Sequence, residues 1–230
     1  MKNVVDTLEY QSYRNEYNYV FSDEYLINVE MNTLSSDFSI KIYRYRDDSQ
    51  IVLPYRVHCN LAHLVNKDSE IVYSIKNINN DAAFFNLIEH SNGKGYLIFR
   101  IDLYGYSVLD LDTMQDYHYI PEESFLGEET FIWTVTHYNK NTNLLVAEGC
   151  YWAHPSDIVL VDFSEPTILP FPEYDLSFLA DGNDLEDIEF ENWDGHDNIV
   201  IKAFCYSENT NIRKVVDTKL LSIKKVNRNN

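Results

Sequence analysis

The chain has few of the residues that form tight turns, break secondary structure or cross-link a fold. Its 230 residues include three cysteines, seven glycines and six prolines. Three cysteines in a chain without an export signal indicate reduced thiols in a cytoplasm and not a disulfide framework. No run approaches the ~18 consecutive apolar residues of a membrane-spanning helix, and the start of the chain lacks the apolar region of a signal peptide. We therefore expect a cytoplasmic protein that contacts no membrane.

Basic residues are also scarce. The chain has 18 Lys and Arg against 37 Asp and Glu, which gives a formal net charge of −19. Residues 162–197 hold 12 acidic and no basic residues, whereas residues 213–230 hold six basic residues and one acidic residue. A field of this sign repels phosphate groups and attracts cations. We therefore expect no nucleic-acid binding, and a basic protein is the partner that the charge favours.

Aromatic residues are abundant, with 18 Tyr and 12 Phe. They suit a pleated, half-buried surface. Short apolar or alternating runs, such as residues 38–45, 50–57, 96–104 and 144–152, recur along the chain and end in turn-forming residues. Asparagine tolerates the left-handed turn conformation and replaces the scarce glycine in these turns. No segment has a convincing helical pattern over three turns, and the best helix candidate is the first dozen residues. The sequence therefore predicts an all-β fold.

The runs repeat at a regular spacing. His90 and His137 are 47 residues apart, and so are Tyr104 and Tyr151. This spacing is close to the ~40–50 residues of a four-stranded propeller blade. It favours a propeller-like array of about four to five antiparallel blades, in a single all-β domain that covers residues 1–230. The predicted repeats are approximately residues 20–78, 80–125, 128–172 and 184–226. A β-sandwich built from successive hairpins is the alternative.

Three acidic residues alternate along one predicted strand. Asp187, Glu189 and Glu191 would share one face of that strand, with successive carboxylates ~7 Å apart. Such a row can bind a cationic ligand or Ca²⁺, which makes a calcium-stabilised structural module one alternative function. The simpler interpretation is a charged edge strand that resists pairing with another chain.

Aromatic side chains at strand ends form a second set of candidate binding residues. These residues are Tyr104, Tyr151 and Trp152. If they cluster at one end of a propeller channel, they would form a stacking surface for a sugar or a peptide. If at least two acids converged there, drawn from Asp110, Asp112, Glu148, Asp157 and Asp162, the site would suit a hydrolase. The sequence has no P-loop, dinucleotide fingerprint, nucleophile elbow or zinc-protease motif. It therefore leans away from an enzyme, and it predicts no cofactor and no metal ligand.

One stretch of the chain resembles a known group of proteins. The stretch contains the runs His137–Asn139, Asn143–Leu145, Gly149–Ala153 and Asp162–Pro166. It is similar to a segment of uncharacterised bacterial cytoplasmic proteins with a WD40-like, propeller-like fold. The resemblance implies a propeller-like β fold and transfers no catalytic residue.

The leading hypothesis for function combines the charge with the missing catalytic motifs. It is a non-enzymatic β-repeat domain that binds a macromolecule through an acidic surface, and the acidic block at residues 162–197 motivates it. The alternatives are a hydrolase-type enzyme with carboxylates and aromatics at a propeller mouth, and the calcium-stabilised module.

Overall fold

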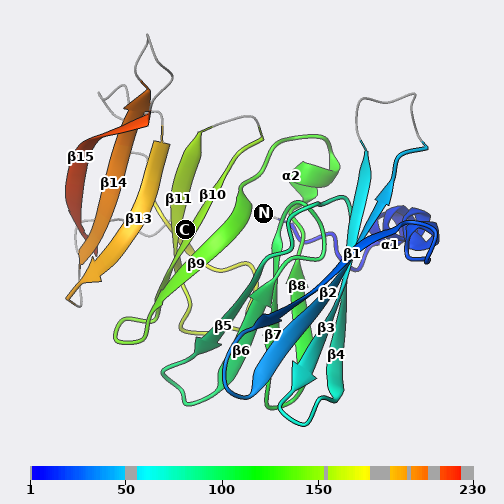
Figure 1. The fold of residues 1–230 in the computed structure, drawn as a ribbon. Coiled ribbons are helices and arrows are strands. Elements are labelled where there is room, and N and C mark those ends of the chain that lie inside the picture. The colour runs from blue at the N-terminus through cyan, green and yellow to red at the C-terminus, as the bar shows by residue number, and fades with distance from the viewer. Residues whose placement is uncertain are drawn as a thin grey trace. The chain divides into compact units, whose positions relative to one another are not determined.

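Strands make up most of the computed structural model, which describes residues 2–49, 56–152, 155–176, 187–195, 198–206 and 213–223. The described chain forms fifteen strands, the helices α1 (Leu8–Glu16) and α2 (Glu122–Phe125), and the 3-10 helix η1 (Asn18–Val20) (Figure 1). The predicted all-β class is confirmed. Within these residues, no helix has the length and apolar character needed to cross a membrane.

The strands form four antiparallel sheets. The first sheet contains β1 (Leu26–Thr33), β2 (Phe38–Asp47), β3 (Val57–Asn66) and β4 (Ile71–Asn77). The second contains β5 (Phe85–Glu89), β6 (Gly95–Phe99), β7 (Tyr106–Asp110) and β8 (Gln115–Tyr119). The third contains β9 (Ile132–Asn139), β10 (Leu144–Cys150), β11 (Ser156–Asp162) and β12 (Glu173–Tyr174). The fourth contains β13 (Asp187–Asp194), β14 (Asn198–Tyr206) and β15 (Arg213–Ser222). In every sheet, strands that follow one another in sequence are hydrogen-bonded neighbours.

The chain divides into two compact units, each of which holds two sheets. Unit 1 comprises residues 1–88 and 94–128, and unit 2 comprises residues 89–93 and 129–230. Each predicted repeat range contains the strands of one sheet, apart from the short β12, which follows directly after the third range. The 47-residue spacing therefore corresponds to the step from the second sheet to the third.

In unit 1 the first two sheets pack face to face around a shared core. Ile40, Leu64 and Ile75 come from the first sheet, and Leu97 and Leu109 come from the second. All five side chains are buried. Alternation along each strand directs these apolar residues to one face, which is the arrangement expected of stacked antiparallel sheets.

Helix α1 begins at Leu8, inside the first dozen residues that are the best helix candidate, and runs past them to Glu16. It is fixed to both sheets of unit 1. The Thr7 hydroxyl accepts a 3.3 Å hydrogen bond from the Tyr10 backbone N–H and caps the helix. The Arg14 guanidinium donates to the backbone oxygens of Ile101 at 2.8 Å and Lys76 at 3.0 Å. Side-chain hydrogen bonds such as these therefore help to hold a mostly polar helix, whose Tyr10 is buried in the core of unit 1.

Unit 2 has its own core between the third and fourth sheets. Val146 and Leu160 come from the third sheet, whereas Ile188, Ile199 and Ile201 come from the fourth. All are buried, with the two β14 isoleucines at or below 1% exposure. At about 25 cal/mol per Å² of apolar surface removed from water, such clusters are the main favourable contribution to folding.

The third strand lies later in the sequence than its apolar pattern predicts. A strand is expected at residues 50–57, but residues 50–55 lie outside the described part and β3 begins at Val57. Its sequence is interrupted by polar residues, of which Asn60 is 1% exposed. The Asn60 amide donates to the Asn80 backbone oxygen at 2.8 Å. A buried amide satisfied by a distant residue does not follow the alternation rule.

Candidate functional site

Unit 1 contains a pocket of about 320 Å³ beside helix α1, which we name the Tyr104 pocket. Its lining combines aromatic rings with one carboxylate and a few neutral polar groups: Tyr10, Tyr13, Asn79, Asp102, Tyr104, Ile120, Ser124, Phe125 and Gly127. The volume is at the lower end of the roughly 300–1,000 Å³ found for ligand sites. The pocket therefore suits one side chain of a partner or one small molecule.

The aromatic wall is built from rings that hold one another edge to face. Tyr10 and Tyr13 are three residues apart on α1, so they lie on the same side of the helix. The Phe125 ring is 6.0 Å from the Tyr10 ring and 5.9 Å from the Tyr13 ring, at interplanar angles of 80° and 68°. Such pairs are favourable beyond their buried area. The rings are therefore in place before any ligand arrives.

Asp102 is the charged group of the pocket, and it is 6% exposed. Its Oδ2 accepts a hydrogen bond from the Tyr10 hydroxyl at 2.9 Å, and its Oδ1 accepts one from the Leu103 N–H at 2.7 Å. Burial raises the pKa of Asp102 to about 6, although these hydrogen bonds and the charges of Arg14 and Arg100 favour the ionised form. At neutral pH the pocket holds a desolvated carboxylate that a further cation would stabilise.

A glycine shapes the loop that carries Asp102 and Tyr104 into the pocket. Gly105 has a φ of +76°, and a Cβ at this position would lie 2.1 Å from the backbone oxygen of Tyr119. Both the left-handed backbone and the close approach to β8 require glycine. Residues 102–105 can therefore turn sharply against the second sheet.

The segment that lines the Tyr104 pocket is acidic, which is a signal that the sequence interpretation missed. Residues 101–128 contain seven Asp and Glu and no Lys or Arg. Bases from elsewhere pair with two of them, Lys94 with Asp110 at 2.9 Å and Lys2 with Glu122 at 2.6 Å. Unit 1 as a whole has 19 acidic and ten basic residues. The field around the pocket therefore favours cations.

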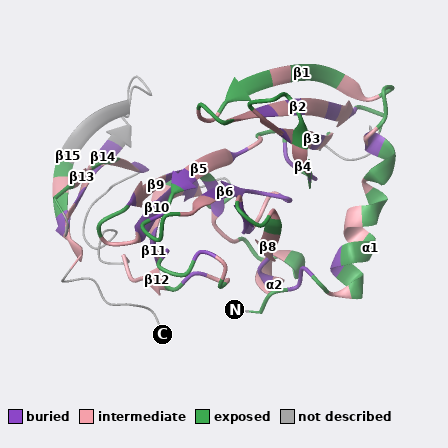
Figure 2. Cartoon of the chain, turned by 90° about the horizontal axis from the view of Figure 1, so that it is seen from below, coloured by how far each residue is buried: buried purple, intermediate pink, exposed green. Residues whose placement is uncertain are grey.

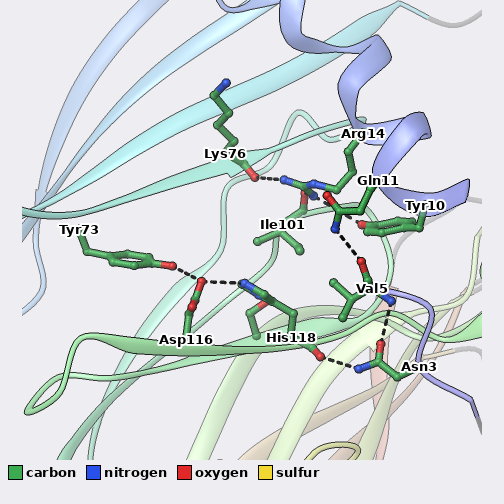
Figure 3. A network of polar contacts seen from close by, with 11 residues as sticks. Asn3, Val5, Tyr10, Gln11, Arg14, Tyr73, Lys76, Ile101, Asp116 and His118 are labelled. Carbon is green, nitrogen blue, oxygen red and sulfur yellow. Dashed lines mark hydrogen bonds and ion pairs between the residues drawn. The ribbon is translucent and has the colours of Figure 1, made fainter. Parts of the chain in front are cut away.

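A second, more polar pocket of about 250 Å³ also borders α1, and we name it the His118 pocket. Its lining is Gln11, Arg14, Tyr73, Ser74, Ile75, Lys76, Phe99, Ile101, Asp116 and His118. The Tyr73 hydroxyl donates to Asp116 Oδ2, and His118 Nε2 lies 2.8 Å from the same oxygen (Figure 3). His118 Nδ1 lies 2.8 Å from the Ser107 hydroxyl. The four side chains form one hydrogen-bonded chain.

Opposing effects set the protonation states in this chain. Burial lowers the pKa of His118 and outweighs the nearby Asp116 carboxylate, which favours the imidazolium. Burial also opposes ionisation of Asp116, but hydrogen bonds from Tyr73 and His118 bring its pKa below the usual value. At neutral pH an ionised Asp116 therefore accepts a hydrogen bond from the Nε2–H of a neutral His118. Nδ1 then accepts from Ser107.

The order of Asp116, His118 and Ser107 resembles a hydrolytic triad in composition but not in access. Ser107 is fully buried, at 0% exposure, so its hydroxyl cannot meet a substrate. Both ring nitrogens of His118 already have protein partners. This row of hydrogen-bonded side chains connects β4 of the first sheet to β7 and β8 of the second, and it fixes the two sheets of unit 1 together.

The acidic residues predicted to share one face lie on β13 in unit 2. Asp187 is buried, and its Oδ1 accepts a 2.7 Å hydrogen bond from the Ser156 N–H. Glu191 lies at a β-bulge and pairs with Lys202 at 2.8 Å, whereas Glu189 is half-buried. The three carboxylates therefore have different surroundings. No three His, Cys, Asp or Glu side chains of the described chain are placed to hold a metal ion.

The three predicted aromatic residues belong to different units. Tyr104 is half-buried in unit 1 and lines the pocket that bears its name. Tyr151 and Trp152 follow β10 in unit 2, where they are 40% and 50% exposed. The Tyr151 ring contacts the Phe131 ring edge to face at 5.5 Å. Sequence position thus identified one member of the aromatic pocket.

Two of the carboxylates considered for hydrolase chemistry, Glu148 and Asp157, serve local structural contacts. Glu148 Oε1 lies 2.5 Å from His137 Nε2, and its Oε2 accepts a hydrogen bond from the Phe190 N–H at 3.2 Å. Asp157 Oδ1 accepts a hydrogen bond from the Ile158 N–H at 2.7 Å, and burial raises the pKa of Asp157. These contacts join β10 to β9 and β13 and shape the start of β11.

Comparisons with known protein families, curated proteins and solved structures found no significant match. The resemblance to the bacterial propeller-like proteins therefore stays a prediction. Function has to be argued from the pockets and the charge.

Proposed function

We propose that this chain is a non-enzymatic binding domain for a basic macromolecule, and that the Tyr104 pocket receives a cationic side chain of that partner. One observation carries the proposal. The buried Asp102 carboxylate lies in a pocket with an aromatic wall, and the surrounding segment, residues 101–128, has no basic residue.

A lysine or arginine side chain suits each part of this pocket. A cation over a tyrosine or phenylalanine face gains about 0.5–2 kcal/mol, with the larger value in desolvated sites. The Asp102 carboxylate adds a charge-assisted partner, and the apolar stem of the guest can pack against Ile120 and Phe125. An anionic guest would instead face Asp102 and the negative field of unit 1.

Binding also fits the described titratable groups better than catalysis does. The Ser107 hydroxyl is closed to solvent, and Glu148 is held by His137. Asp102 is the buried acid that borders an aromatic pocket, and its hydrogen bonds fix it in one position. A fixed carboxylate with preorganised rings is the pattern of a recognition site.

A titration with short charged peptides tests this proposal. Calorimetry at low and moderate salt would compare hexalysine with hexaglutamate on the wild-type chain and on Phe125→Ala. Trp152→Ala, which removes an exposed aromatic side chain from unit 2, is the matched control. We expect hexalysine to bind and hexaglutamate not to bind. The affinity for hexalysine should fall as salt rises, and Phe125→Ala should lower it roughly three- to tenfold. No hexalysine binding at low salt, or equal losses in both variants, would contradict the proposal.

The acidic block at residues 162–197 is the competing docking segment. Its described part lies in unit 2, and residues 177–186 and 196–197 lie outside the described residues. Charge reversal separates the two surfaces. Glu128→Lys changes an exposed acid beside the Tyr104 pocket, and Glu165→Lys changes an exposed acid of the block. We expect Glu128→Lys to weaken hexalysine binding more. The reverse order would move the binding surface to unit 2.

We further propose that the four sheets are successive blades of a propeller-like array. The support is that all four are meanders in sequence order, one per repeat, and that sheets pack face to face within each unit. A sandwich of hairpins is the competing architecture. An experimental structure in which the four sheets do not surround a common axis would exclude the array.

A further inference from the structure

Strand β1 is an exposed edge strand. Within the described residues it is hydrogen-bonded to β2 alone. Six of its eight residues are exposed, and Figure 2 shows the strand mostly in the colour of exposed residues. Three of the six are large apolar side chains, Ile27, Val29 and Met31, at 50%, 43% and 56% exposure. Among the described residues, the edge of β1 that faces away from β2 pairs with no strand.

We propose that β1 pairs antiparallel with β1 of a second copy of this chain, about a twofold axis through Val29. This inference is independent of the proposed function, because it involves neither the Tyr104 pocket nor a basic partner. Twofold dimers, in which the same surface of each copy meets the other, are the commonest closed homo-oligomers, and an edge strand that pairs with itself makes such an interface. It would join two four-stranded sheets into one continuous sheet.

Most of β1 lacks the features that keep edge strands apart. Edges are usually protected by lysine, proline, bulges or inward-pointing charges. The sequence of β1, LINVEMNT, contains no Lys, Arg or Pro. Its one acid, Glu30, forms an ion pair with Arg44 at 2.6 Å, and the bulge lies between Leu26 and Asn28, near the start of the strand. The stretch from Asn28 to Thr33 is regular and unprotected.

Avoidance of opposed carboxylates selects the register of this pairing. With the axis at Val29, the two valines face each other and Glu30 of each copy faces Asn28 of the other. With the axis one residue further, the two Glu30 carboxylates would be directly opposite, at ~5 Å between Cβ atoms, which is unfavourable. The Val29 register places apolar beside apolar residues and acid beside amide.

The net charge of the chain determines how the dimer responds to salt. Each copy carries a net charge of −19, so two copies repel each other at long range. Salt screens this repulsion, whereas it leaves backbone hydrogen bonds and apolar contacts at β1 in place. We therefore expect dimerisation to strengthen as salt rises. Docking of a basic partner would show the opposite dependence.

Sedimentation at increasing protein concentration, at low and moderate salt, tests the proposal. We expect the wild-type chain to dimerise more strongly at moderate salt. Val29→Lys should weaken dimerisation roughly tenfold or more, because it places two lysines opposite each other. Ile71→Lys makes the same change at an exposed residue of β4, the other edge of this sheet, and should leave dimerisation intact. A monomer under all conditions, or equal effects of the two variants, would overturn the proposal.

Cross-linking tests the register without relying on affinity. Under mild oxidation Val29→Cys should form a covalent dimer, because Cβ atoms of directly opposed residues are ~5 Å apart, close to the span of a disulfide. Asn32→Cys is the control, since the two Asn32 positions would be ~20 Å apart in this register. The wild-type chain corrects for the native cysteines. Faster cross-linking at residue 32 than at residue 29 would exclude the Val29 register.

Discussion

The hydroxyl of Tyr10 donates a 2.9 Å hydrogen bond to the carboxylate of Asp102, a residue 92 positions later in the chain. This contact joins helix α1 to the loop after β6, and it lies where the Tyr104 pocket borders the core of unit 1. Because Asp102 is buried, the same contact links the structure of the pocket to pH.

Replacement of Asp102 by Asn should flatten the pH dependence of stability. The folded-state pKa of Asp102 is about 6, above the ~3.9 of an unfolded aspartate. The folded state therefore binds this proton more tightly, and the associated stability is present below pH ~4 and lost as pH rises through 6. In urea unfolding, Asp102→Asn should gain up to ~3 kcal/mol relative to wild type between pH 4 and pH 7. Parallel profiles for both proteins would contradict the raised pKa.

The sheets were predictable because most of their pairing is local. Each strand pairs with the next one along the chain, so short alternating runs separated by turns carry most of the topology. The strands β8 and β3 were not predicted at their observed positions, for physical reasons. β8 has the polar sequence QDYHY and buries its polar side chains in the Tyr73–Asp116–His118 chain. β3 contains the buried Asn60, which is satisfied by a residue of a later loop.

The candidate site was predictable only in part, because its residues meet through tertiary contacts. Tyr104 could be selected from the repeat, but Tyr10 and Tyr13 reach the pocket through the docking of α1, and Phe125 through α2. No spacing rule links residues 10, 104 and 125. The run from 101 to 128, which has no Lys or Arg, is a signal for an acidic surface. The longer acidic block at residues 162–197 gives a stronger signal of the same kind, so the sequence favours that block.

Removal of the Tyr73 hydroxyl should raise the pKa of Asp116. The hydrogen bond from Tyr73 helps to overcome burial and to hold this pKa below its usual value. A lowered carboxylate pKa contributes stability above the unfolded value, and the contribution is lost as pH falls through the folded value. Tyr73→Phe should therefore cost about 1 kcal/mol at neutral pH and less in acid. Carboxylate titration by NMR would measure the shift. The control is Tyr117→Phe, which removes a hydroxyl from β8, the strand that carries Asp116. An unchanged Asp116 titration would refute the assignment.

Alanine at Gly105 should be strongly destabilising. A Cβ there would lie 2.1 Å from the Tyr119 backbone oxygen, and φ is +76°. The loop or β8 must move, which we expect to cost about 2–4 kcal/mol in urea unfolding. Gly93→Ala is the matched control, because Gly93 has a φ of +87° with open space around the added Cβ. It should cost only the ~1–2 kcal/mol of the left-handed backbone. Similar losses in the two variants would argue against a close approach at Gly105.

Two acids on β13 should differ sharply in their importance for stability. Asp187 is buried and accepts a 2.7 Å hydrogen bond from the Ser156 N–H at the start of β11. Glu191 is exposed and forms a surface pair with Lys202 at 2.8 Å. Asp187→Ala removes a charged acceptor from a backbone donor and should cost about 1–3 kcal/mol. Glu191→Ala removes an exposed ion pair and should cost at most ~1 kcal/mol.

Urea unfolding of the two β13 variants at neutral pH and two salt concentrations would separate these roles. The effect of Glu191→Ala should shrink at the higher salt, because the pair is exposed and screened. The effect of Asp187→Ala should persist, because its hydrogen bond is shielded from solvent. If both effects disappeared with salt, Asp187 would act through surface charge, and the predicted charged face of β13 would be restored.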